Sequence, residues 1–154
     1  MIFPLLRIMI GSVLLVSGFE KVISPPQNFL YVIQAYQLLP GWAEDPASVL
    51  MPWAEFIIGL FVVLGLWTQR VLRWALMLFA VFIIVVGQAL LRGLPLEHCG
   101  CFGSWIQVSP QQILVFDSAC LLVIFLLLRC LSGTQRFSVD GYFGQSPDER
   151  KKTR

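Results

Sequence analysis

The fold is decided by residues 71–91, which read VLRWALMLFAVFIIVVGQALL and hold a single charged side chain, Arg73. A helix needs about 20 consecutive, mostly apolar residues to cross the hydrocarbon core of a bilayer. Runs of similar length and character occupy residues 3–23, 49–67 and 110–131. The whole chain agrees, because 57% of its 154 residues are hydrophobic and only 13% are charged, which is too apolar for a soluble domain. We therefore predict an all-α integral membrane protein, a bundle of four transmembrane helices.

The segment between the first two predicted spans divides into a short helix and a loop. Ser24-Pro25-Pro26 ends the first span, because proline has no backbone N–H to donate. Residues 40–46, with two prolines, predict a loop, which leaves Pro52 in the first turn of the second span. Between them, apolar residues recur at helical spacing over a stretch too short to cross a bilayer: Phe29, Val32, Ile33, Tyr36 and Leu39. This pattern predicts a short interfacial or re-entrant helix, with an ordinary amphipathic connector as the alternative.

Length and charge set the domain organisation and the orientation. Residues 1–131 make up the transmembrane domain, and residues 132–154 form a polar tail with little to bury. Lys and Arg collect on the cytoplasmic side of bacterial inner-membrane proteins. With both termini cytoplasmic, only Lys21 and Arg92 lie outside, and the others lie inside: Arg7, Arg70, Arg73, Arg129, Arg136, Arg150, Lys151, Lys152 and Arg154. We predict this multi-pass topology in the bacterial inner membrane, with membrane lipid and no nucleic acid as a partner.

The loop between the third and fourth predicted spans carries the motif Cys99-Gly100-Cys101, preceded by His98. The predicted topology places this loop in the periplasm, an oxidising compartment where disulfides persist. A disulfide between residues two apart closes a very small ring, and Gly100 supplies the backbone freedom that the ring needs. Strained disulfides of this kind are easily reduced. The imidazolium of His98 would favour the thiolate form of Cys99. The candidate catalytic residues are therefore His98, Cys99 and Cys101.

Three other interpretations of this motif remain open. The cysteines could be two incidental thiols, they could stabilise a structural turn, or they could bind a metal together with His98. Three ligands fall short of a closed zinc site, so we predict no metal here. A redox-active Cys99–Cys101 disulfide is the interpretation that we favour.

Polar side chains inside the predicted spans form a second candidate site. Charged groups in hydrocarbon cost at least about 2.5 kcal/mol near the bilayer centre, so those that remain are usually paired or functional. In the predicted topology all of them lie in the outer half of the bundle: Glu20, Lys21, Glu55, Gln88 and Asp117. They predict one polar layer beneath the cysteine loop, able to hold a proton, a quinone head group or a substrate. The alternative is that they are interhelical hydrogen-bonding contacts, each worth on the order of 1 kcal/mol.

Small residues and a further cysteine predict close packing around this layer. Gly11 and Gly18 share a face of the first span, and Gly59 lies one turn beyond Glu55, so both helices offer places for close backbone approach. Cys120 lies three residues after Asp117 on the same helix face. We predict a buried, unreactive thiol there, because apolar surroundings suppress thiolate formation.

A pattern of residues runs through nearly the whole chain up to Arg129. It consists of Arg7, Gly11, Gly18-Phe19-Glu20-Lys21, Tyr36 with Leu39-Pro40, Pro52-Trp53-Ala54-Glu55 with Gly59, and Arg92-Gly93 followed by Cys99-Gly100-Cys101-Phe102-Gly103. In this pattern the chain resembles the DoxX and MauE family of small membrane proteins. The Cys-Gly-Cys-Phe-Gly run favours the MauE branch.

This resemblance implies a role in methylamine utilisation and in the maturation of a disulfide-rich dehydrogenase subunit, often beside a thioredoxin-like partner. The wider family includes a subunit of a thiosulfate:quinone oxidoreductase, and its layout is similar to that of quinone-linked disulfide enzymes of the vitamin K epoxide reductase and DsbB type. Those enzymes shuttle electrons through a second cysteine pair, whereas only Cys99 and Cys101 lie on the outer side of this chain. Fold similarity does not by itself establish shared chemistry.

We therefore expect an enzyme, a membrane thiol:disulfide oxidoreductase or the redox subunit of one. It would exchange electrons between a periplasmic thioredoxin-like or disulfide-containing partner and a membrane quinone held near Glu55, Gln88 and Asp117. Two other classes remain open. One is a non-catalytic membrane scaffold that recruits a partner enzyme, and the other is a small-molecule carrier that uses the polar layer as its path.

Overall fold

The structure, a computed structural model, describes residues 2–93 and 109–129 of the chain. Within these residues it consists of α-helices and has no strand. The helices are α1 (Ile2–Ile23), α2 (Pro26–Tyr36), α3 (Gly41–Leu64), α4 (Thr68–Leu91) and α5 (Pro110–Arg129). The predicted cysteine motif and the whole of the predicted tail lie outside the described residues.

Three of the helices, α3, α4 and α5, are long and apolar enough to cross a membrane. α1 is also long, with 22 residues, but it carries three ionisable side chains: Arg7, Glu20 and Lys21. Helices are suited to lipid because every backbone polar group is satisfied within the segment. These features are those of a multi-pass membrane protein.

The prediction of a loop over residues 40–46 is wrong, because α3 begins at Gly41 and contains both Pro46 and Pro52. Pro40, with extended backbone angles, caps the helix instead. Proline is tolerated inside membrane helices where other groups satisfy the freed backbone atoms. Pro52 therefore lies well inside the helix and not in its first turn.

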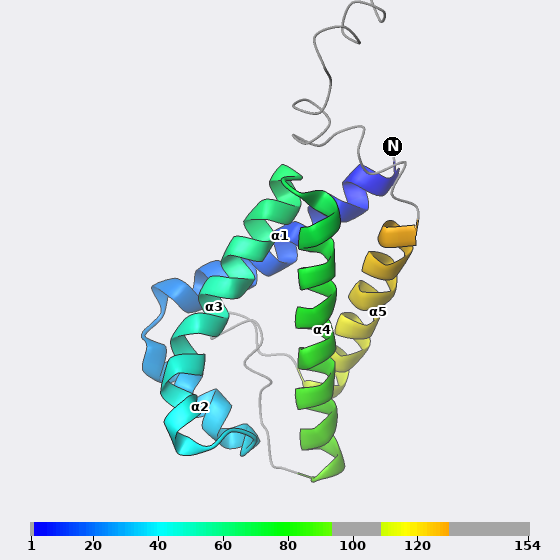
Figure 1. The fold of residues 1–154 in the computed structure, drawn as a ribbon. Helices are drawn as coiled ribbons and strands as arrows, with labels where there is room; N and C mark the ends of the chain where they lie inside the picture. Colours follow the sequence, from blue (N-terminus) through cyan, green and yellow to red (C-terminus); the bar gives the residue numbers. More distant parts are fainter. Residues whose placement is uncertain (1, 94–108, 130–154) are drawn as a thin grey trace, which may run out of the picture.

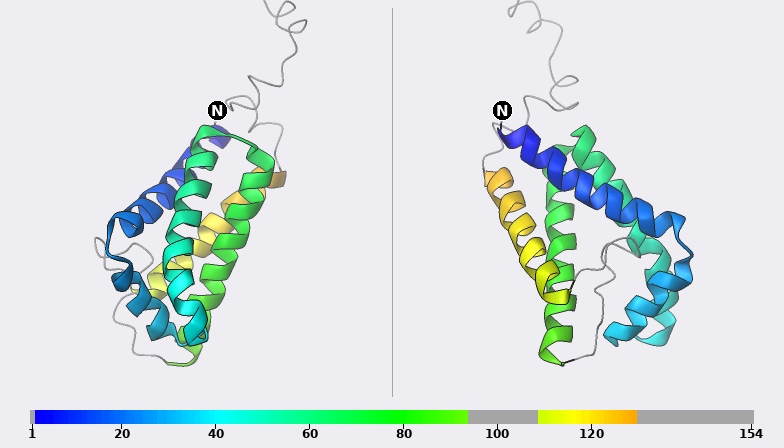
Figure 2. Two further views of the ribbon diagram at one scale, coloured as in Figure 1. Left: turned by 60° about the vertical axis from the view of Figure 1, so that its left-hand side comes forward. Right: turned by 180° about the vertical axis from the view of Figure 1, so that it is seen from behind.

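The long helices alternate in direction, as Figure 1 shows. The upper end of the bundle in that view holds the start of α1, the turn between α3 and α4, and the end of α5. The lower end holds α2, the start of α3, the end of α4 and the start of α5. α1 descends obliquely across the bundle toward α2, which is clearest from behind in Figure 2.

α1 packs most extensively against α3, and two glycines permit this contact. A Cβ atom on Gly18 would lie 2.8 Å from the Cα of Phe56, and one on Gly59 would lie 2.8 Å from the Cα of Leu15. Each glycine therefore faces the backbone of the opposite helix, as the sequence predicted for this pair of helices. Association of helices in lipid depends on such close van der Waals packing, since lipid tails are as apolar as leucine.

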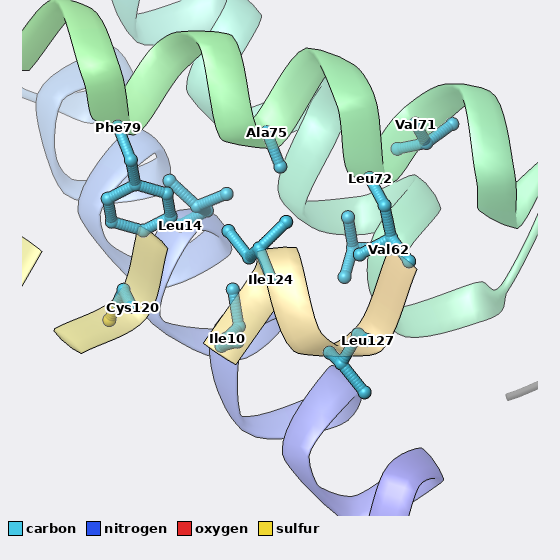
Figure 3. Close-up of a cluster of buried hydrophobic side chains, with 10 residues drawn as sticks. All are labelled: Ile10, Leu14, Val62, Val71, Leu72, Ala75, Phe79, Cys120, Ile124 and Leu127. Carbon is cyan, nitrogen blue, oxygen red and sulfur yellow. The ribbon is translucent and has the colours of Figure 1, made fainter. Parts of the chain in front are cut away.

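The main apolar core lies in the upper half of the bundle, where α1, α3, α4 and α5 meet. Figure 3 shows its side chains, which come from all four helices and include Leu14, Phe79 and Ile124. Cys120 borders this core. A second, smaller cluster in the lower half is made of Tyr36, Val86, Ala89 and Ile113. The core thus closes the upper half of the bundle, where the polar side chains of Arg7 and Thr68 are also buried.

Candidate functional site

A buried ion pair joins α1 to α3 below the main core. The Nζ atom of Lys21 lies 2.6 Å from Oε2 of Glu55, and the two side chains are 2% and 0% exposed. The position follows from the glycine contact, because Gly18 lies one turn before Lys21 and rests against the backbone at Glu55 and Phe56. A charge-assisted hydrogen bond of this length is among the stronger polar contacts in proteins.

Ser17 completes the contact on the same face of α1, four residues before Lys21. Its hydroxyl donates to Oε2 of Glu55 at 3.0 Å and accepts from Nζ of Lys21 at 2.9 Å. The three side chains thus form a closed triangle of hydrogen bonds. The sequence analysis missed Ser17, although its spacing from Lys21 placed both residues on one helix face.

Asp117 of α5 belongs to the same buried group. Its residue exposure is 5%, and it interacts electrostatically with both Glu55 and Lys21. Oδ2 of Asp117 and Oε1 of Glu55 have no hydrogen-bond partner among the described residues. Among the described residues Lys21 forms its ion pair with Glu55, and Asp117 adds a second buried carboxyl group to the same region. Burial of unpaired charge is costly, so this arrangement can accept a proton or a hydrogen-bond donor.

The other two residues of the predicted polar layer have partners one turn away in their own helices. Glu20 is buried and accepts a hydrogen bond of 3.3 Å from the hydroxyl of Ser24. The half-buried Gln88, with its amide oxygen turned toward Arg92, accepts from that guanidinium at 3.2 Å. The structure therefore brings together Lys21, Glu55 and Asp117 from the predicted layer, while these two have local contacts.

Aromatic rings flank the ammonium on two sides. Nζ of Lys21 lies 5.3 Å from the ring centroid of Phe29 in α2 and 5.9 Å from that of Phe82 in α4. Cation–π attraction operates within about 6 Å of a ring centroid. Lys21 of α1 thus contacts α2, α3 and α4. The sequence analysis missed Phe82 and assigned Phe29 only to the apolar face of a short helix.

The predicted catalytic residues His98, Cys99 and Cys101 lie outside the described residues. The helices on either side of them are described: α4 ends at Leu91 and α5 begins at Pro110, both at the lower end of the bundle (Figure 1). Cys120 is a free, buried cysteine that borders the apolar core, in agreement with the prediction of a buried thiol.

Comparison with known proteins agrees with this architecture. The family model of methylamine utilisation protein MauE matches residues 1–130. A curated MauE of Methylorubrum extorquens is 27% identical over 93 residues, which is 60% of this chain and 50% of that protein. Protein TlpB of Flavobacterium psychrophilum is 25% identical over 139 residues, 84% of this chain and 37% of TlpB.

The aligned regions therefore span at most half the length of these two relatives. No solved structure matches the chain. The family match extends from the start of α1 to the end of α5 and includes the residues between α4 and α5. The chain therefore belongs to the family of methylamine utilisation protein MauE.

Proposed function

We propose that the chain is a four-span protein of the bacterial inner membrane, in which α1 crosses the membrane in addition to α3, α4 and α5. In this topology α2 lies at the outer interface and both termini lie in the cytoplasm. The direction of the helices supports this topology, because the described basic residues divide between the two ends. Lys21 and Arg92 lie toward the lower end, which would face the periplasm. The upper end, which would face the cytoplasm, holds the others: Arg7, Arg70, Arg73 and Arg129.

We further propose that the protein is a thiol:disulfide oxidoreductase, or the redox subunit of one, with Cys99 and Cys101 as the exchanging pair. One observation carries the proposal. The segment that holds the cysteines leaves α4 and enters α5 at the lower end, and the buried group of Lys21, Glu55 and Asp117 lies in the same half of the bundle. Its partner would be a periplasmic thioredoxin-like protein or a disulfide-containing client, as in maturation of a disulfide-rich dehydrogenase subunit.

The exchange needs no group outside the two proteins. A thiolate of the partner attacks one sulfur of the Cys99–Cys101 disulfide, the bond between these two sulfurs breaks, and the other sulfur leaves as a thiolate that takes up a proton. The second thiol of the partner then attacks the mixed disulfide. The products are a partner disulfide and a Cys99/Cys101 dithiol, so two electrons and two protons have moved to this chain.

The dithiol must return to the disulfide before the next exchange. A membrane quinone, when bound, supplies an acceptor for two electrons and two protons. The residues present fit such a group, since the buried ammonium of Lys21 is a donor for a carbonyl oxygen, and Glu55 and Asp117 hold buried oxygen atoms without a hydrogen-bond partner among the described residues that can take up protons. These carboxyl groups can hold a proton out of contact with water. Lys21 keeps Glu55 in place through the 2.6 Å contact.

Trapping of the mixed disulfide tests the exchange and the orientation together. The full chain is assayed in right-side-out membrane vesicles, with a thioredoxin that lacks its resolving cysteine added to the outside. We expect a covalent adduct with the wild-type chain and none with the Cys99→Ser/Cys101→Ser variant. Cys120→Ser is the matched control, and it should form the adduct as the wild type does, because this thiol is buried beside the core.

Three outcomes would contradict the proposal. An adduct that persists in the Cys99→Ser/Cys101→Ser variant would show that these cysteines do not carry the exchange. An adduct that forms only in inside-out vesicles would reverse the topology. If the double variant kept the physiological function of the chain, a scaffold or carrier would replace the oxidoreductase.

A further inference from the structure

A cavity of about 150 Å³ lies in the lower half of the bundle, between α2, α3, α4 and the end of α1. Its walls are almost entirely aliphatic and aromatic, and they include Phe29 and Tyr36 of α2 and Val81 and Phe82 of α4. Sites for drug-sized molecules measure roughly 300–1,000 Å³. This cavity therefore has room for one ring rather than for a whole elongated molecule.

The rim of the cavity reaches the outside of the bundle. Val81 lines the cavity and is 43% exposed, and Leu38, at the end of α2, lines it and is 39% exposed. An apolar tail attached to a ring in the cavity can leave past these side chains. In the proposed topology it would leave into lipid.

Lys21 is the only charged side chain among the described residues that line the cavity. An ammonium group has three N–H donors. One donates to Glu55 and one to Ser17, so the third has no hydrogen-bond partner in the part of the chain that the structure describes. The cavity thus offers one strong donor, placed between the rings of Phe29 and Phe82.

The charge balance selects a neutral ligand over an anion. Glu55 already neutralises Lys21, and Asp117 adds a second carboxyl group nearby. A phosphate or carboxylate in the cavity would bring a further negative charge into a buried site that has no cation left to pair with it. A carbonyl oxygen accepts a hydrogen bond from the ammonium without adding charge.

We propose that this cavity binds the ring of a membrane quinone, with one ring carbonyl accepting a hydrogen bond from Nζ of Lys21. Phe29 and Phe82 contact the ring, and the isoprenoid tail leaves past Val81 and Leu38. Lys21 holds a proton against the ligand oxygen, and Glu55 and Ser17 are positioning residues that fix the ammonium. This site differs from the one expected from the sequence, since Glu55, Gln88 and Asp117 do not line the cavity.

The inference deepens the proposed function and rests on it for the use of the quinone, but the binding itself is tested without any redox step. The probe is ubiquinone-1, titrated into the full chain in detergent micelles and followed by calorimetry. The same titration with the Cys99→Ser/Cys101→Ser variant should give the same affinity. If the wild type does not bind ubiquinone-1 but still traps thioredoxin, this inference alone is overturned and the proposed thiol exchange stands.

Two substitutions test the position of the ring. Val81→Trp fills the cavity without altering charge, and we expect ubiquinone-1 to bind at least tenfold more weakly. Ile84→Trp is the matched control on α4, because Ile84 is 66% exposed and does not line the cavity, and it should bind as the wild type does. Equal affinity in Val81→Trp and the wild type would place the quinone elsewhere and overturn the proposal.

A third variant tests the hydrogen bond. Lys21→Met is combined with Glu55→Gln and Asp117→Asn so that no unpaired charge of this group remains buried, and we expect at least tenfold weaker binding of ubiquinone-1. Thermal unfolding of the variant confirms that it is folded. Oleate is the anionic comparison, and it should not displace ubiquinone-1 from the wild type. Displacement by oleate would show that the ammonium binds anions and would contradict the charge argument.

Discussion

The upper and lower halves of the bundle are built on different interactions. The upper half is closed by apolar side chains from α1, α3, α4 and α5, and it surrounds Ile124, which is fully buried. The lower half contains an ion pair between fully buried side chains, a second buried carboxyl group on Asp117, and a cavity. A dry apolar core suffices for folding, whereas buried charges and empty volume are costly and need another explanation. We therefore expect the upper half, in which Arg7 is the one buried charged side chain among the described residues, to contribute mainly stability, and the lower half to carry the function.

The largest change in stability is expected when one partner of the ion pair is removed. Glu55→Ala leaves the ammonium of Lys21 buried without its carboxylate, and loss of one partner of a buried pair costs about 3–5 kcal/mol. We expect this decrease in the free energy of unfolding, measured by SDS titration of the full chain in mixed micelles. The triple variant Lys21→Met/Glu55→Leu/Asp117→Asn removes all three ionisable groups and should be close to the wild type in stability. If Glu55→Ala were as stable as the wild type, the pair would not be buried as described.

The helix contact that holds the ion pair gives the next largest effect. Gly18→Ala places a methyl group 2.8 Å from the Cα of Phe56, so α1 and α3 must move apart. Overpacking of this kind costs roughly 1–3 kcal/mol. Gly87→Ala is the matched control, since its methyl group would lie 3.6 Å from Cδ1 of Leu114, an ordinary contact. Thermal unfolding in detergent should show a lower melting temperature for Gly18→Ala and little change for Gly87→Ala. Equal melting temperatures would argue against the close approach of the two helices.

A conservative change in the upper half should have the smallest effect on stability and none on the chemistry. Ile124 is 0% exposed, and Ile124→Val removes one buried methylene at a cost of roughly 0.5–1.5 kcal/mol. Leu122→Val, at a position that is 57% exposed, serves as the control and should leave stability unchanged. Both variants should trap thioredoxin as the wild type does. Loss of trapping in Ile124→Val would show that the two halves are coupled.

Much of the helical layout could be predicted from the sequence, because apolar runs bounded by polar residues are local features. The short helix α2 follows Pro25 and the long helix α4 ends at Leu91, both as predicted. The start of α3 could not be predicted in this way. Pro40 and Pro46 predict a loop by local rules, with Pro52 in the first turn of the next span, but the helix begins at Gly41 and continues through Pro46 and Pro52.

The candidate site was predicted in composition but not in geometry. Depth along each helix identified Lys21, Glu55 and Asp117 as members of one layer. Depth alone does not show which way a side chain turns, so it also included Gln88, which turns toward Arg92. The hydrogen bonds of Ser17 and the ring of Phe82 were missed, because an isolated serine or phenylalanine in an apolar span carries no signal of its own.

By itself the sequence determined that this protein consists of long helices suited to lipid, with a cysteine motif between two of them, because hydropathy and motif spacing are properties of the chain alone. Only the tertiary structure decided that Lys21 pairs with Glu55 and that a cavity opens beside them. Both depend on how closely α1 approaches α3 at Gly18 and on how α2 lies against α3 and α4. Such distances arise from the packing of separate segments against one another, and no single segment encodes them.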